Sequence, residues 1–188
     1  MSKAKNILPL TIAAGAMILS WLILRKNKQQ DTLINNNEEE IDMRTNTMLP
    51  RGYRNNNPLN IRINADNNWQ GKVLVNTDRV FEQFTSMPYG YRAALKLIRN
   101  YITNYGCNTV AKIIEKWAPP TENNTDKYIA DVCKLSGLQP DTIIGYNSKT
   151  ALKKMVYAMS IIENGNTDAT RAAGLPNMDI IEQGYKLL

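Results

Sequence analysis

The chain has 188 residues, of which 43% are hydrophobic, and this length suffices for one folded domain with a core plus additional segments. Its net charge of +6 favours polyanionic partners such as nucleic acid, anionic membrane or the acidic polymers of a cell wall. The chain has no histidine, which excludes a Ser-His-Asp triad, a Cys-His peptidase and a histidine-ligated zinc hydrolase. Any catalysis must therefore use carboxylates, hydroxyls, lysine or tyrosine.

The two cysteines, Cys107 and Cys133, do not form a metal-binding pair. Two buried free thiols are the favoured interpretation, and a single disulfide between them is the alternative. We expect no metal site and no cofactor.

Residues 6–24 predict a transmembrane helix. They carry no charge and lie between basic residues, with residues 1–5 forming a short basic N-terminus. At about 1.5 Å per residue they nearly cross a hydrocarbon core of about 30 Å. Trp21 lies near one predicted interface, where indole is favoured. A cleaved signal peptide is the alternative, and the orientation in the membrane stays open because both flanks are basic.

Residues 25–50 predict a polar, flexible linker. They contain few apolar residues, runs of Asn and Glu, and no sustained period. The acidic run Glu38–Glu40 is interpreted as solvated charge on this tether rather than as a catalytic cluster.

The remainder, residues 51–188, predicts one folded domain that begins with short strands. Residues 58–63, 72–75 and 79–84 are rich in β-formers and are separated by Asn, Asp and Gly. We expect these segments to form a small β-sheet.

Helices follow along the rest of the domain. Apolar residues recur at spacings of three and four within residues 88–106, 108–120, 125–137, 148–165 and 178–188. Gly106, Pro119 and Gly137 end the first three segments, and Thr125 is a good N-cap. The expected fold class is α+β, mostly α.

Several motifs resemble a family of phage-encoded proteins. In chain order they are RGYRNNNPLNIR at 51–62, NNWQG at 67–71, FEQFTSMPYGYRAALKLIRNY at 81–101, WAPPTENNTDKYI at 117–129 and MVYAMSIIENG at 155–165. Members of that family are described as virion structural proteins or as peptidoglycan-degrading, lysozyme-like proteins. The resemblance implies a lysozyme-like fold with a small sheet and a helical lobe. Leu59 stands where the family has glycine, which questions any need for a positive φ at this position.

The Asn-rich stretch predicts a structured turn, because Asn side chains satisfy backbone groups and Pro58 disfavours helix at the preceding residue. Two interpretations of its arginines stay open: they pair with nearby acids, or they line a polar groove for an amidated, acidic sugar polymer. The residues predicted to bind substrate are Arg51, Arg54, Asn56, Asn57, Asn60, Arg62 and Trp69.

Two glutamates are the candidate catalytic acids, because glycoside cleavage needs a general acid. Glu163 ends a long apolar helix in SIIENG, where partial desolvation beside Ile161 and Ile162 favours the protonated form. Lysozyme-like transglycosylases place their acid in a similar helix-end context, although there it precedes the sheet in sequence. Glu122 matches the glutamate of the WAPP-x-EN motif, and it could instead only favour a helix N-terminus.

Other carboxylates and aromatic residues are weaker candidates. Asp78 and Glu82 flank a predicted strand and could supply a second carboxylate. The aromatic residues that could stack on sugar rings are Trp69, Trp117, Tyr53, Tyr89 and Tyr91, and Trp117 is assigned to the core.

Three functional hypotheses compete. The first is a membrane-anchored virion protein that degrades peptidoglycan glycan strands during entry, as a glycosidase or lytic transglycosylase. The second is a non-catalytic virion protein that links a membrane to capsid or vertex proteins. The third is an endolysin with a releasable signal anchor in the host inner membrane. No specific nucleic-acid partner is expected, because the basic residues are dispersed.

Overall fold

The computed structural model describes residues 24–32 and 48–188. The chain divides into two compact units, Met1–Asn46 and Thr47–Leu188. In the first unit, residues 24–32 are helical. No helix in the described ranges is both long and apolar enough to cross a membrane. Apart from Leu24, the membrane span expected over 6–24 lies outside the described residues, as does most of the expected linker.

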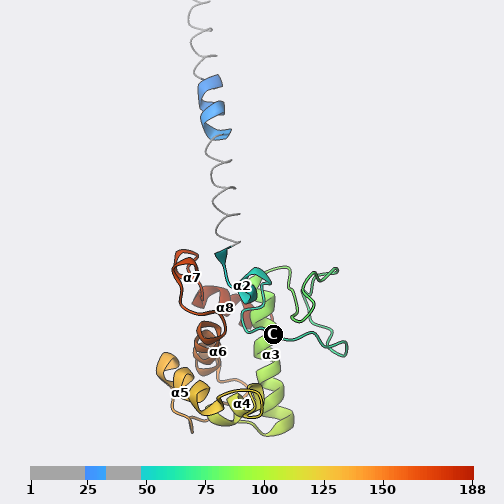
Figure 1. Ribbon diagram of the computed structural model, residues 1–188, viewed down its shortest axis with the longest axis vertical. Coiled ribbons are helices and arrows are strands. Elements are labelled where there is room, and N and C mark those ends of the chain that lie inside the picture. Colours follow the sequence, from blue (N-terminus) through green and yellow to red (C-terminus); the bar gives the residue numbers. More distant parts are fainter. Residues whose placement is uncertain (1–23, 33–47) are drawn as a thin grey trace, which may run out of the picture. The chain divides into compact units, whose positions relative to one another are not determined.

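The second unit is built mainly from helices, and Figure 1 shows the long helix α3 with α5, α6 and α7 to its left. Five of them confirm predicted segments: α3 (Met87–Tyr105), α4 (Val110–Trp117), α5 (Thr125–Ser136), α6 (Lys149–Asn164) and α8 (Met178–Lys186). Two short helices were not expected, α2 (Arg51–Arg54) and α7 (Asp168–Ala172). The beginning of α5 also differs, because Asn124 is the N-cap and its side chain accepts from the Lys127 amide.

Helices α3, α6 and α8 form the centre of the core. The fully buried side chains include Tyr91, Leu95 and Ile98 of α3, Met155 and Met159 of α6, and Ile181 of α8. Helix α3 packs most extensively against α8, and α6 packs against α5. The apolar stripe predicted for α3 is thus the face that meets the core.

The predicted small β-sheet was wrong. Residues 48–188 contain no strand or sheet, only isolated antiparallel bridges that pair Arg62 with Phe81, Lys72 with Phe84, and Thr109 with Ile143. The first two bridges do join the segments expected to be strands. The fold is therefore mostly helical, and the lysozyme-like α+β expectation does not hold.

Asparagine side chains explain why the pairing stays so short. Asn57 is fully buried: its Oδ1 accepts from the Ile61 amide at 2.9 Å, and its Nδ2 donates to the carbonyls of Ile61 and Glu82 at 2.9 Å. These bonds satisfy backbone groups that a strand ladder would otherwise use. Asn56 and Asn60 have φ values of 51° and 50°, a left-handed conformation that interrupts an extended strand.

The Asn-rich turn packs against the start of α3. A β-carbon at Gly90 would overlap the carbonyl oxygen of Asn56, so only glycine permits this approach. Leu59, in contrast, is a core residue that is 1% exposed, and the positive φ falls on its neighbour Asn60. The family's glycine is therefore not needed at position 59.

Candidate active site

Glu163 lies in the last turn of α6, where three neutral donors converge on its half-buried carboxylate. Oε1 accepts from the Tyr128 hydroxyl at 2.9 Å and from the Trp117 indole nitrogen at 3.4 Å. Oε2 accepts from Asn60 Nδ2 at 3.1 Å. The carboxylate is thus oriented by side chains from three segments that are distant in sequence.

Each donor occupies a fixed place in the fold. Trp117 is the last residue of α4, Tyr128 lies in the first turn of α5, and Asn60 follows Leu59, which anchors the turn in the core. Thr125 fixes the start of α5 against the end of α4, because its hydroxyl donates to the Ala118 carbonyl at 2.6 Å. The α4–α5 connection therefore holds Trp117 and Tyr128 on the same side of the carboxylate.

The end of α6 is tied to the Asn-rich turn. Asn164 is buried, and its Nδ2 donates to the Pro58 carbonyl at 2.7 Å and to the Ser160 carbonyl at 3.0 Å. Gly52 of α2 permits this junction, because a β-carbon there would overlap Asn164 Oδ1 and lie 2.7 Å from Asn60 Oδ1. Both of these amide oxygens are buried without a hydrogen-bond partner.

Tyr128 is held as a proton donor. Burial raises the pKa of this phenol, and the negative charge of Glu163 and the hydrogen bond to it raise the pKa further. Its hydroxyl therefore keeps its proton across the physiological range. Tyr128 was not singled out from the sequence, although it falls within the WAPPTENNTDKYI motif.

Glu163 faces a cleft of about 550 Å³. The residues that line it are Leu59, Asn60, Ile61, Arg62, Ile63, Asn64, Asn67, Phe81, Leu97, Tyr101, Trp117, Ala118, Glu122, Asn123, Tyr128 and Glu163. Amides, aromatic rings and carboxylates together suit a polar ligand with flat faces. Both predicted catalytic glutamates are present, with Glu122 exposed on the turn after Pro119.

The predicted substrate-binding residues separate into two groups. Asn60 and Arg62 line the cleft, whereas Arg51, Arg54, Asn56, Asn57 and Trp69 do not. Asn56 donates to the Phe84 carbonyl at 3.0 Å, so it serves the turn, as Asn57 does. Trp69 is 8% exposed in the core and borders a separate hollow of about 310 Å³.

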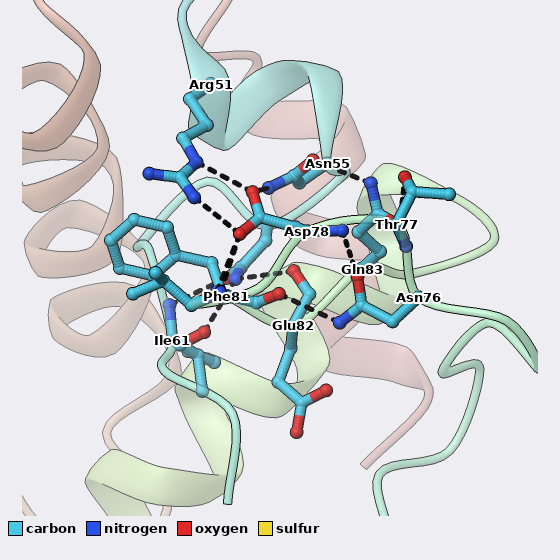
Figure 2. Close-up of polar contacts among 11 residues, drawn as sticks. Arg51, Asn55, Ile61, Asn76, Thr77, Asp78, Phe81, Glu82 and Gln83 are labelled. Atoms are coloured by element: carbon cyan, nitrogen blue, oxygen red, sulfur yellow. Dashed lines mark hydrogen bonds and ion pairs between the residues drawn. The ribbon is translucent and has the colours of Figure 1, made fainter.

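Arg51 binds Asp78, as Figure 2 shows, and it is not among the residues that line the cleft. Its Nε and Nη2 donate to the two carboxylate oxygens at 2.7 and 2.6 Å. Asp78 also accepts from Asn55 and from the amides of Val80 and Phe81. The hydrogen bond from Arg51 lowers the pKa of Asp78 well below its usual range, against the opposing effect of desolvation. Asp78 is therefore a structural anion and not a second catalytic carboxylate.

The other weaker candidates are structural as well. Glu82 is fully buried with Lys72 Nζ 3.0 Å from its carboxylate, which points away from the Arg51–Asp78 pair in Figure 2. Tyr53 and Tyr91 are core residues. Trp117, which was assigned to the core, is partly buried and packs against the core, and its indole nitrogen also donates to Glu163.

Among the described residues, no three or more Cys, Asp or Glu side chains lie close enough together to hold a metal ion. Cys107 and Cys133 are free thiols, and both are partly exposed instead of buried.

The fold and the cleft define a small helical domain with a carboxylate site, in which Glu163 accepts hydrogen bonds from three uncharged side chains. No protein-family model matches the chain. It is similar to Protein P5 of Pseudoalteromonas phage PM2, with 35% identity over 138 residues, which cover 72% of this chain and 80% of the relative. The chain therefore belongs to the family of this phage protein, and the phage part of the expected function is confirmed.

Proposed function

We propose that the chain is a phage virion protein that cleaves the glycan strands of peptidoglycan, with Glu163 as the general acid. The observation that supports this proposal is the convergence of Asn60, Trp117 and Tyr128 on a half-buried carboxylate inside a cleft. The similarity to a phage protein supports the phage origin of the chain.

The contrast with other carboxylates strengthens the assignment. Asp78, Glu82 and Glu182 each face a cation, and the hydrogen bonds from Lys149 and then Lys153 lower the pKa of Glu182 to about 2. Within the described part of the chain, no Lys or Arg lies at ion-pair distance from Glu163. Neutral donors keep the carboxyl group oriented in both protonation states, as proton transfer in two directions requires.

In the proposed reaction, the proton on Oε2 moves to the glycosidic oxygen, the C1–O bond breaks, and the leaving sugar departs as an alcohol. An oxygen nucleophile then bonds to C1 and returns its proton to the Glu163 carboxylate. Water as the nucleophile gives hydrolysis, whereas the 6-hydroxyl of the same sugar gives a 1,6-anhydro ring. Glu122 lines the same cleft and is the alternative candidate for the general acid.

Glu163→Gln in the purified full chain tests the proposal. The release of soluble fragments from purified peptidoglycan should fall by about 100-fold or more, the scale of general acid catalysis. The glutamine keeps an acceptor for Tyr128 and Trp117, and Asn60 can turn its unpartnered Oδ1 toward the new amide. The unfolding free energy should therefore change by less than about 1 kcal/mol.

Glu115→Gln is the matched control, because Glu115 is exposed on α4 and should retain full activity. Mass spectrometry of the fragments separates the two reactions, since an anhydro product lacks one water. Full activity of Glu163→Gln together with loss in Glu122→Gln would move the acid to Glu122.

The alternative function is a non-catalytic structural protein of the virion, linking to capsid or vertex proteins. The observation that favours it is that Glu163 joins α4, α5 and the Asn-rich turn, as a purely structural cross-link would. In that case the wild-type chain releases no fragments from the walls of its host, and the measurable effect of Glu163→Gln is on stability.

A further inference from the structure

Arg62 and Arg51 both lie beside the Phe81 ring, but they differ in their acidic partners. The guanidinium carbon of Arg62 lies 5.9 Å from the centre of the Phe81 ring, and that of Arg51 lies 4.7 Å from the same centre. Arg51 is bound to Asp78, so its charge is neutralised within the protein. Arg62 is exposed, and among the described residues no carboxylate lies within ion-pair distance of it.

Arg62 lies in the wall of the cleft that contains Glu163. Of the described residues that line this cleft, Arg62 is the single cationic one, and the others are asparagines, aromatic and aliphatic residues and two glutamates. Phe81 supports the guanidinium from one side, and the antiparallel bridge between the two residues fixes the backbone below it. The Arg62 guanidinium is thereby held by its ring contact and not by its N–H groups, and these N–H groups can bind a ligand.

We propose that Arg62 binds a carboxylate of the glycan strand and makes the cleft selective for acidic strands over neutral ones. This inference rests on the proposed function for the substrate class. A guanidinium pairs with a carboxylate through two parallel hydrogen bonds, which a neutral acetamido sugar cannot offer. In peptidoglycan the carboxylate has two sources, the lactyl ether of muramic acid once its peptide is removed, or the peptide stem itself.

The attraction also offsets an unfavourable feature of the site. Glu122 also lines the cleft, and an acidic strand would meet a like charge there. A cation at the wall reduces this repulsion and fixes which part of the strand faces it. Arg62 would therefore set the register of the strand relative to Glu163.

Binding to the full chain carrying Glu163→Gln, which keeps ligands intact, tests the proposal. Three soluble probes are compared by calorimetry: peptidoglycan fragments with peptide stems, the same strands stripped of stems by an amidase, and a neutral N-acetylglucosamine hexamer. Adding Arg62→Gln should weaken binding of an acidic probe about tenfold and leave the hexamer unchanged. The acidic probe that loses affinity identifies the source of the carboxylate.

Two further variants sharpen the result. Arg79→Gln removes the same charge from an exposed arginine outside the cleft lining and should leave every affinity unchanged. Arg62→Lys keeps the charge without the planar guanidinium and should recover only part of the affinity. Equal loss for the hexamer, no loss for any probe, or no binding by any probe would each overturn the role of Arg62.

The outcomes separate this inference from the catalytic proposal. If the wild-type chain releases no fragments but the acidic probes bind through Arg62, cleavage fails and the carboxylate subsite stands. If fragments are released and Arg62→Gln binds all probes as before, the subsite fails and cleavage stands.

Discussion

The Tyr128 hydroxyl donates to Glu163 Oε1 across 2.9 Å, from the first turn of α5 to the last turn of α6. Because burial and the nearby carboxylate raise the pKa of Tyr128, this bond persists at any pH at which the domain is expected to work. Tyr128 is thus a positioning residue for the proposed acid.

Tyr128→Phe should lower kcat about tenfold and leave KM nearly unchanged, because the ring still fills its place while the carboxyl loses one of its three donors. Steady-state kinetics on soluble glycan strands measure the two constants. Tyr146→Phe, on an exposed tyrosine outside the cleft, is the control. A parallel rise in KM, or loss of cooperative unfolding, would show that Tyr128 mainly supports the fold.

Asn57→Ala should destabilise the domain by about 3 kcal/mol. The change leaves the buried Ile61 amide and the Glu82 carbonyl without their partner, and an unsatisfied buried group costs about 1–3 kcal/mol. Chemical denaturation of the full chain measures the difference. Asn68→Ala, at an exposed asparagine, should change stability by less than about 0.5 kcal/mol. Equal effects of the two variants would mean that the Asn-rich turn is ordinary surface.

Asp78→Asn should destabilise the domain near neutral pH and matter less as the solution becomes acidic. Its folded pKa is lowered by Arg51, so the stabilisation is present above the ordinary carboxyl pKa of about 4 and is lost as pH falls toward the folded value. Melting curves of wild type and variant should therefore converge between about pH 4 and pH 2. A gap that widens toward acid would contradict the ion pair.

A chain that begins at Leu49 should fold by itself. Residues 47–188 form one compact unit, and the core residues between Tyr53 and Ile181 lie entirely within it. Circular dichroism should show a single cooperative unfolding transition for the shortened chain. Aggregation of this chain under conditions in which the full chain stays dispersed would argue against an independent domain.

The sequence predicts the parts of this molecule that depend on local patterns. The three-and-four spacing of Tyr91, Ala94, Leu95 and Ile98 locates α3, because one face of a helix must meet the core. Glu163 could be singled out because it lies in the last turn of a long apolar helix, two residues before a glycine. It lines one cleft together with Glu122, and its catalytic role stays a prediction.

What the sequence did not reveal depends on contacts between distant segments. The sheet was expected because residues 58–63 and 79–84 look like strands, but the Asn57 side chain takes over part of their pairing. Trp117 has an apolar-face position that indicates core, yet its indole nitrogen reaches Glu163. Nothing local distinguishes Arg51 from Arg62, and only the folded position of Asp78 decides which of them is neutralised.

Glu163 and its three hydrogen-bond donors are synthesised in a fixed order. Asn60, Trp117 and Tyr128 leave the ribosome before Glu163, and α6 can join the cleft only after its last turn has emerged. A nascent or prematurely terminated chain that ends between Tyr128 and Glu163 would carry the three donors but not the acid. If the proposed activity is correct, truncated products of translation are harmless to the cell wall of the host that makes them.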